Sequence, residues 1–442
     1  MANNEEKQFT SNVIISGICK PGAMILSYLY VPVALGYLGI EKYGVWSTIL
    51  TLISWIGYFD IGIGNGLRNR LTEVFNRKEK GNARKIVSSA YAISILVMMA
   101  ITIIFVLFAC FIDWYKVFGV QNMDENLRIV VIESIVLVAF NFVMNLCVNV
   151  LYALQKASVV SLLQLIILAI NYVLVLIIRE FTVGNLTILA FVYGASFVLV
   201  NFIASIILFL RNNEIAPNLR YVDWGYGSEI VKLGFKFFVI QICALILFAT
   251  DSLIISYLYG AKEVTPYSTV NKLFMAVSGI YIAFITPLWS SVTKDKTNKD
   301  ITRMERTIRN LFLLMIPFVV ATVVLFLVFQ PLADWWLKQH LDYSIPLLIC
   351  GSLYCVLNMW CSINAYILNG LEVMKPSLII AILQAVVNIP LSLLFALKFN
   401  MESTGVLLGT VISMTIAAVC QPIFVARELK RLKQGQENDI SE

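Results

Sequence analysis

The chain has 442 residues, of which 59% are hydrophobic and only 14% are charged, and its mean hydropathy is +0.83. A soluble domain of this length could not bury so much apolar surface, so the composition excludes ordinary soluble folds and indicates a membrane protein. The formal net charge of +6 comes from basic residues that flank apolar runs. It is a topology signal, and no nucleic-acid partner is expected.

About twelve apolar runs are long enough to cross a hydrocarbon core of about 30 Å. They are continuous and do not alternate apolar with polar residues, which favours helices over a barrel. The predicted fold is an all-α integral membrane protein with about 12 transmembrane helices in two pseudo-symmetric six-helix bundles. In chain order, the predicted spans are residues 12–38, 43–64, 86–110, 128–152, 158–178, 186–210, 234–258, 265–289, 310–330, 344–369, 376–397 and 405–425.

The two halves of the chain resemble each other. An offset of 221 places Gly39 on Gly260, and an offset of 217 places Asn141 on Asn358 and Asn171 on Asn388. Because each half has an even number of spans, the halves are expected to run parallel, related by an axis along the membrane normal. The predicted domains are an N-terminal bundle (1–213), a turn-rich cytoplasmic linker (214–233) that permits hinge motion, and a C-terminal bundle (234–442).

Lys and Arg residues gather in alternate loops, which predicts that both termini are cytoplasmic. The expected inner loops carry Arg68, Arg70, Arg77, Lys78, Lys80, Arg84 and Lys85 after the second span, and a second basic cluster between Lys294 and Arg309. No extramembrane domain fits in the short outer loops. Transporters built from duplicated halves place their binding site between them, so we look for intramembrane polar residues.

Five ionisable residues fall within predicted spans: Lys20, Asp60, Glu133, Asp251 and Lys272. Each costs about 2.5–3.5 kcal/mol on insertion scales and needs a reason. Lys20 either snorkels to the inner surface or faces an internal cavity. Asp251 and Lys272 reach similar depth in consecutive spans, so they either form an ion pair or act directly in transport. Asp60 lies near the depth of Lys20, and Glu133 lies close to the outer edge.

Three asparagines, Asn141, Asn145 and Asn149, recur four residues apart in the fourth span. On a continuous helix they share one face, which drifts about 40° per step. Asn358 occupies the position equivalent to Asn141 in the second half. Such amides either hydrogen-bond between helices or form a polar wall suited to sugar hydroxyls. Both readings stay open.

No cofactor and no metal site are expected. All eight cysteines fall within spans, which argues against a disulfide framework. The only histidine, His340, lies in an expected outer loop without evident ligand partners, and we interpret it as a surface residue near an aromatic belt.

The stretch from Phe59 to Asn69, FDIGIGNGLRN, closely resembles a motif of polysaccharide repeat-unit flippases. These form the O-antigen and capsular branch of the multidrug/oligosaccharidyl-lipid/polysaccharide exporter superfamily. Thr250–Ile255, Val264–Tyr267 and Pro287–Ser290 are similar to the same branch. Together the motifs and the twelve-span layout extend the resemblance over nearly the whole chain.

The resemblance implies a flippase, not an enzyme, in the bacterial cytoplasmic membrane. Such a protein moves an undecaprenyl-diphosphate-linked oligosaccharide to the outer leaflet by alternating access, coupled to H⁺ or Na⁺. The implied partners are the lipid-linked oligosaccharide, membrane lipid, and polysaccharide polymerase and chain-length proteins. Lys20, Lys272 and Arg68 could contact the diphosphate, although Arg68 also suits an ordinary positive-inside anchor. Asp60, Asp251 and Glu133 are the candidates for ion coupling or gating.

Two alternatives remain. A cation-coupled multidrug extruder of the same superfamily would use the three intramembrane carboxylates to hold an ion or a cationic drug. A membrane polymerase or glycosyltransferase would need a sizeable extramembrane domain or a nucleotide site. The chain shows neither a Gly-rich phosphate loop nor metal-ligand spacing, which disfavours the enzyme.

Overall fold

The computed structural model describes residues 2–58, 62–76, 80–121, 123–229, 242, 245–247, 250–286, 288, 292, 295–296, 300–371 and 373–441. Every regular element in these ranges is helical, which confirms the predicted all-α fold. Among the described residues, ten helices are long and apolar enough to cross a membrane. The chain divides into two compact units, Met1–Ile242 and Cys243–Glu442.

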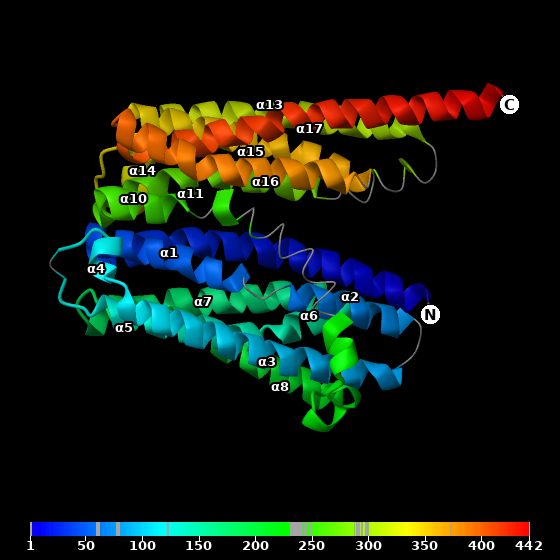
Figure 1. Ribbon diagram of the computed structural model, residues 1–442, viewed down its shortest axis with the longest axis horizontal. Helices are drawn as coiled ribbons and strands as arrows, with labels where there is room; N and C mark the ends of the chain where they lie inside the picture. The colour runs from blue at the N-terminus through cyan, green and yellow to red at the C-terminus, as the bar shows by residue number, and fades with distance from the viewer. Residues whose placement is uncertain are drawn as a thin grey trace. The chain divides into compact units, whose positions relative to one another are not determined.

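Unit 1 is a bundle of long helices that lie side by side (Figure 1). Its helices are α1 (Ala2–Tyr58), α2 (Ile63–Asn76), α3 (Lys80–Phe111), α4 (Trp114–Val117), α5 (Leu127–Met144), α6 (Leu146–Ala153), α7 (Ala157–Phe181) and α8 (Leu186–Arg211), followed by the short 3₁₀ turns η1 (Asn213–Ile215) and η2 (Leu219–Tyr221). Most of these helices expose large apolar side chains, as expected where lipid surrounds the bundle.

Unit 2 repeats this architecture. Its described helices are α10 (Asp251–Tyr259), α11 (Ala261–Ile285), α13 (Ile301–Leu327), α14 (Phe329–Leu337), α15 (Ile345–Gly370), α16 (Met374–Leu393) and α17 (Glu402–Ser441), with the π-helical turn η3 (Leu394–Lys398) between the last two. Helices α15, α16 and α17 pack closely together, and α11 lies against α15.

Helix α1 contains two predicted spans joined at Gly39, whose backbone takes φ 76° and ψ 171°. This region of backbone space is essentially open only to glycine, so the residue turns the chain between two helices. Figure 1 shows the second half of α1 returning beside the first. Gly260, its repeat equivalent, joins α10 to α11 with φ 89° and ψ 163°. The same rare conformation at both positions supports the internal duplication.

The kink in α1 also explains why ten membrane-spanning candidates correspond to eleven of the predicted spans. The apolar segment Ile15–Ser54 has 40 residues and is long enough for two crossings. Much of the remaining predicted span, 234–258, lies outside the described residues, although the apolar helical stretch Leu245–Tyr259 covers its later part.

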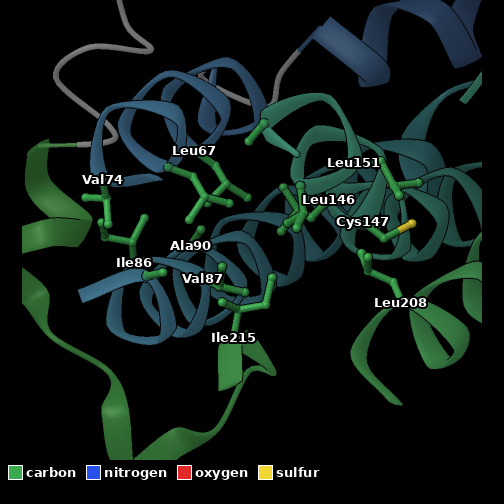
Figure 2. Packing of buried hydrophobic residues seen from close by; sticks show 14 of the residues in the cluster. Leu67, Val74, Ile86, Val87, Ala90, Leu146, Cys147, Leu151, Leu208 and Ile215 are labelled. Atoms are coloured by element: carbon green, nitrogen blue, oxygen red, sulfur yellow. The ribbon is translucent and has the colours of Figure 1, made fainter. Parts of the chain in front are cut away.

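The basic segment after the second span was expected to be a loop, and that expectation was wrong. Residues 63–76 form the amphipathic helix α2, which buries Ile63, Leu67, Leu71 and Val74. Figure 2 shows these side chains packing with others from α3, α6 and η1. Apolar residues at three- and four-residue spacing form one stripe on the helix, while its arginines stay on the other face.

The predicted fourth span is not one helix but two, because a turn at Asn145 separates α5 from α6. The Val148 N–H donates to the Asn145 carbonyl, three residues back, at 3.0 Å. That bond is tighter than the four-residue spacing of an α-helix. The Ser205 hydroxyl on α8 lies 2.8 Å from the Asn201 carbonyl of its own helix and 3.3 Å from the Met144 carbonyl, so its single proton is shared between the two. In unit 2 the equivalent helix, α15, runs unbroken from Ile345 to Gly370.

The linker that was expected to permit hinge motion is bonded to unit 1 over its described part, residues 214–229. The Ser89 hydroxyl of α3 accepts from the Asp223 N–H at 2.9 Å and lies 2.9 Å from the Asp223 carbonyl. Arg84 stacks 4.5 Å above the Tyr221 ring and donates to the Ala216 carbonyl at 3.1 Å. The described part of the predicted linker thus belongs to the compact unit Met1–Ile242.

Candidate functional site

Unit 1 contains a partly open cavity of about 290 Å³ beside the interruption between α5 and α6. Helices α1, α5 and α8 supply the walls, and the amides of Asn141 and Asn145 reach it. Among the described residues, no charged side chain lines the cavity. The lining residues are Ile53, Ser54, Ser134, Leu137, Val138, Asn141, Phe142, Asn145, Ala190, Tyr193, Gly194 and Phe197.

The two amides are held differently. The side-chain oxygen of Asn141, Oδ1, accepts from Asn201 Nδ2 on α8 at 2.9 Å, so Asn141 also joins two helices. Asn145 lies at the turn itself, and its side chain makes no capping hydrogen bond to α6. The Asn201 side-chain oxygen is buried without a hydrogen-bond partner. Polar groups thus concentrate where the span is interrupted.

Aromatic rings also belong to the cavity lining. Tyr193 lies with its ring centre 5.1 Å from that of Phe197 and 5.2 Å from that of Trp46, the latter edge-on. Tyr30, which like Trp46 is not among the lining residues, lies 6.3 Å from Tyr193. Such packing fixes the Tyr193 and Phe197 rings, which add rigid apolar surface to the lining.

Asn149, which follows the turn on α6, is not among the lining residues of the cavity. Its amide lies under α2, where a methyl group added at Gly64 would approach Asn149 Nδ2 to 2.6 Å. One turn further along α2, the Arg68 guanidinium stacks 4.6 Å above the Tyr152 ring. The glycine-rich motif therefore seats α2 on α6. Arg68 is exposed and contacts Tyr152 as a cation–π partner.

Asn358 in unit 2 makes contacts between helices. Its Nδ2 lies 3.4 Å from the Ser278 hydroxyl and 3.4 Å from the Met275 sulfur, both on α11. The Ser362 hydroxyl, one turn along α15, donates to the side-chain oxygen Oδ1 of Asn358 at 3.5 Å. Of the two readings for this amide, these contacts match hydrogen bonding between helices.

Asp251 is the most enclosed of the predicted site residues, with 3% of its surface exposed. Tyr267 on α11 donates to one carboxylate oxygen at 3.0 Å, and Thr410 on α17 lies 3.0 Å from both. Asn388 on α16 then donates to Thr410 at 2.9 Å. A buried carboxylate is costly unless hydrogen-bonded, and here hydroxyl groups from two other helices provide that.

Lys272 is partly buried on α11, but it does not share the side of that helix that faces Asp251. Tyr267, which bonds the carboxylate, precedes it by five residues. Five residues correspond to about 500°, or about 140° around the helix. One of the two predicted roles of Asp251 was an ion pair with Lys272. The hydrogen-bond partners of Asp251 that the structure describes are instead hydroxyl groups.

The remaining candidates are dispersed. Lys20 is exposed on α1, and Glu133 is partly exposed on α5, next to Ser134 of the cavity wall. Asp60 lies outside the described residues. The structure therefore brings together Asn141 and Asn145, and it places Asp251 in a separate network inside unit 2.

His340 has acidic neighbours that the sequence did not reveal. Its Nδ1 lies 2.9 Å from Asp334 Oδ2 at the end of α14, and its Nε2 lies 3.3 Å from Asp342 Oδ1. The hydrogen bond to Asp334 raises the pKa of His340 above its ordinary value, and the same contact lowers the pKa of Asp334. All three groups lie between the candidate spans of α13 and α15.

Several residues at these sites were not singled out beforehand. Tyr267 and Thr250 lie in segments that resemble the flippase branch, and Asn388 is one of the repeat-related asparagines, so each carried a weak signal. Thr410 carried none. Phe142, Tyr193 and Phe197 were hidden because aromatic residues are ordinary in an apolar span.

The comparisons agree with this architecture. Residues 9–293 match the model of the family described as polysaccharide biosynthesis protein, and residues 237–394 match the MatE family model. A "Putative O-antigen transporter" of Salmonella typhimurium is 22% identical, with 92% of this chain and 91% of that protein covered. A "Putative O-antigen export protein" of Yersinia pseudotuberculosis is 21% identical over 89% of this chain and 90% of its own length.

Solved structures share the fold. The inward-facing conformation of a multidrug resistance MATE family transporter of the MOP superfamily has a TM-score of 0.78 at 16% identity, covering 93% of this chain and 96% of that one. An outward-facing conformation of such a transporter gives 0.64, again at 16% identity, with 96% of each chain covered. The chain is therefore a multi-pass membrane protein with a transporter fold, and it belongs to the polysaccharide biosynthesis protein family.

Proposed function

We propose that this protein is a flippase that moves undecaprenyl-diphosphate-linked oligosaccharides from the cytoplasmic to the outer leaflet of the bacterial cytoplasmic membrane. The family and the names of the relatives support a role in polysaccharide export. Movement would proceed by alternating access, with both termini in the cytoplasm. Polysaccharide polymerase and chain-length proteins would act on the exported units.

The observation that carries this proposal is the lining of the cavity in unit 1. Its walls combine amide, hydroxyl and aromatic groups, and no acidic residue is among the described residues that form them. A pocket for cationic drugs would be expected to present a carboxylate, since an organic cation needs a counter-charge when it leaves water. A polar and neutral pocket instead favours a ligand rich in hydroxyl groups.

The diphosphate needs cations, and basic residues outside that cavity could supply them. Lys20 is exposed on α1, Arg68 is exposed on α2, and Lys272 is partly buried on α11. Cationic side chains form short, charge-assisted hydrogen bonds with phosphate oxygens. Arg68 already stacks on Tyr152, which holds its guanidinium plane in one orientation while its edges remain available.

Asp251 is our candidate for coupling to H⁺ or Na⁺. Its carboxylate is buried and accepts from the hydroxyls of Tyr267 and Thr410, and the Asn388 amide nitrogen donates to Thr410. Loss of an ion from such a site leaves a charge in a medium of low polarity, so occupancy and conformation should be linked. Asp251→Asn should therefore insert and fold normally but transport poorly.

The decisive experiment is deletion of the gene followed by measurement of which leaflet holds the lipid-linked repeat units. The proposal requires that they accumulate on the cytoplasmic leaflet, and that plasmid-borne protein restores export. Lys20→Ala and Lys272→Ala should lower export at equal membrane abundance, whereas Lys→Arg at either position should retain part of it. Normal export in the deletion strain, or ion-dependent dye efflux by the protein, would contradict the proposal and favour a drug extruder.

The lysine variants also separate two roles of Lys272. An ion pair with Asp251 would make Lys272→Ala harmful because it strands an acid, and Asp251→Asn would then rescue it. The hydroxyl partners of Asp251 lead us to expect no rescue. Lys20→Gln should be harmful if Lys20 contacts substrate and harmless if the side chain only snorkels.

A further inference from the structure

The interruption at Asn145 distinguishes the two halves of this duplicated protein. In unit 1 the span divides into α5 and α6 at Asn145. In unit 2 the equivalent position is Ser362, which lies inside the continuous helix α15 and donates to Asn358. An interruption within a membrane span frees backbone groups from the helix and is tolerated where it lines a cavity or is satisfied by neighbours. A feature present in one half alone calls for a local cause.

The local environment of the interruption is a pocket whose lining combines two kinds of chemistry. Asn141 and Asn145 contribute amides, while Tyr193 and Phe197 contribute aromatic rings. Sugar rings combine apolar C–H faces with hydroxyl groups around the edge. Aromatic faces suit the first, and amides, which both donate and accept, suit the second.

The size of the cavity limits the occupant. Its volume of about 290 Å³ is at the lower end of the range for ligand sites, roughly 300–1,000 Å³. One sugar ring, which is smaller than a drug-sized ligand, fits this space, and a whole repeat unit does not. The remainder of the substrate must lie elsewhere.

The charge of the lining limits the occupant further. None of the described lining residues is cationic, so the carboxylate of an acidic sugar would lose its hydration without gaining a counter-charge from them. Burial of an unpaired charge is far more costly than burial of a hydrogen-bonded hydroxyl. The pocket should therefore discriminate between neutral and acidic sugars.

We infer that the cavity at the α5–α6 interruption is a specificity subsite for one neutral sugar ring of the lipid-linked oligosaccharide. Asn145 and Asn141 bond its hydroxyls, and Tyr193 and Phe197 contact its apolar face. The inference rests on the proposed function, and it separates sugar recognition from diphosphate recognition. The first takes place at this cavity, and the second involves basic residues that do not line it.

The test is native mass spectrometry of the full-length protein in detergent, with three purified lipids. These are undecaprenyl diphosphate, the same lipid carrying N-acetylglucosamine, and the same lipid carrying glucuronic acid. We expect the neutral sugar to tighten binding about tenfold over the lipid without sugar, as a few hydrogen bonds would give. Glucuronic acid should bring no such gain.

Variants place the effect in the cavity. Asn145→Ala should reduce the gain from N-acetylglucosamine about fivefold and leave binding of undecaprenyl diphosphate unchanged, which also shows that the variant is folded. Ser54→Leu is a second variant at an exposed position of the lining, and it should reduce the gain by narrowing the space. Ser362→Ala is the matched control, because it removes a polar group at the repeat-equivalent position of unit 2.

The outcomes are distinguishable. If the wild-type protein binds none of the three lipids, both the inference and the proposed function are wrong. If it gains from N-acetylglucosamine but Asn145→Ala and Ser54→Leu retain the full gain, the flippase proposal stands and the subsite is wrong. An equal gain from glucuronic acid would overturn the claim that the subsite selects neutral sugars.

Discussion

Asp251 shows how one buried charge depends on residues from three helices. Its oxygens accept from Tyr267 and Thr410, and Thr410 in turn accepts from Asn388. Thr410 thus occupies the centre of the network, since it is both a donor and an acceptor. Loss of its hydroxyl therefore takes one partner from each of two buried polar groups, not from one.

Thr410→Val keeps the volume of the side chain and removes the hydroxyl. We expect it to lower the free energy of unfolding by about 1–3 kcal/mol, because the Asp251 carboxylate and the Asn388 amide both lose a partner. Thermal unfolding of the purified protein in detergent would measure this. Thr415→Val is the control on the same helix, since that exposed hydroxyl bonds only to Ile412 of its own turn. Equal stability of the two variants would contradict the network.

His340 makes the loop after α14 dependent on pH. The hydrogen bond to Asp334 raises the pKa of His340, so the folded loop favours the protonated ring. The stabilisation is fully present below the unfolded pKa of about 6.5 and is lost as the pH rises through the higher value in the folded protein.

Hydrogen exchange of residues 329–343 would detect this change. Protection factors, which correct for the intrinsic effect of pH on exchange, should be larger near about pH 6 than near about pH 9. His340→Gln should remove the difference, and the helix interior of α15 should not show it. Protection that rises with pH in the wild-type loop would exclude the assigned contact.

Two features distinguish unit 1 from a simple bundle of continuous helices: the packing of α2 against α6, and the interruption between α5 and α6 at Asn145. Both depend on contacts between segments far apart in the sequence. Gly64 allows α2 to approach Asn149 because a side chain there would collide with the amide. Ser205, from α8, brings its hydroxyl to 3.3 Å from the Met144 carbonyl.

Gly64→Ala tests the seat of α2. The added methyl group would lie 2.6 Å from Asn149 Nδ2, so we expect overpacking to destabilise unit 1 by about 1–3 kcal/mol. Asn149→Ala in the same chain makes room and should restore part of the loss. Gly279→Ala is the control, because a methyl group there meets nothing within 4 Å. Additive effects of the two substitutions would show that the residues do not touch.

The sequence predicted the helices well because continuous apolar runs carry a strong signal. It misjudged α2, although Ile63, Leu67, Leu71 and Val74 follow helical spacing, because the basic residues among them were weighed as a topology signal. It could not predict the interruption at Asn145, because the backbone there departs little from helical geometry, with φ −68° and ψ −10°. Tertiary contacts, and not the four-residue spacing alone, decide that Asn141 lines the cavity and Asn149 does not.

For the whole molecule, the sequence indicates an even number of crossings and hence termini on one side of the membrane. Gly39 and Gly260 mark equivalent turns in the two halves, as a duplication with an even span number requires. The locations of the coupling ion and of the diphosphate could not be predicted. Both depend on which polar side chains meet in space, as the hydroxyl partners of Asp251 illustrate.

Reporter fusions would test the topology. Alkaline phosphatase fused after Phe181, at the end of α7, should be active because that loop is expected outside. The same enzyme fused at the C-terminus should be inactive, and a fluorescent protein there should fold and emit. Active phosphatase at the C-terminus would place that end outside and contradict the predicted topology.

The uncharged described lining of the cavity in unit 1 has a consequence for how ligand binding depends on ionic strength. Dissolved salt screens interactions between charges, with a Debye length of about 10 Å at about 0.1 M, but it leaves hydrogen bonds to neutral groups and aromatic contacts nearly unaffected. Binding of undecaprenyl diphosphate should therefore weaken steeply as salt is added, while the additional gain from a neutral sugar stays constant. The test compares undecaprenyl diphosphate with and without N-acetylglucosamine, plotting the logarithm of the binding constant against the logarithm of the salt concentration. The two lines should be parallel if diphosphate and sugar are recognised in separate places, and they should converge if one charged residue binds both.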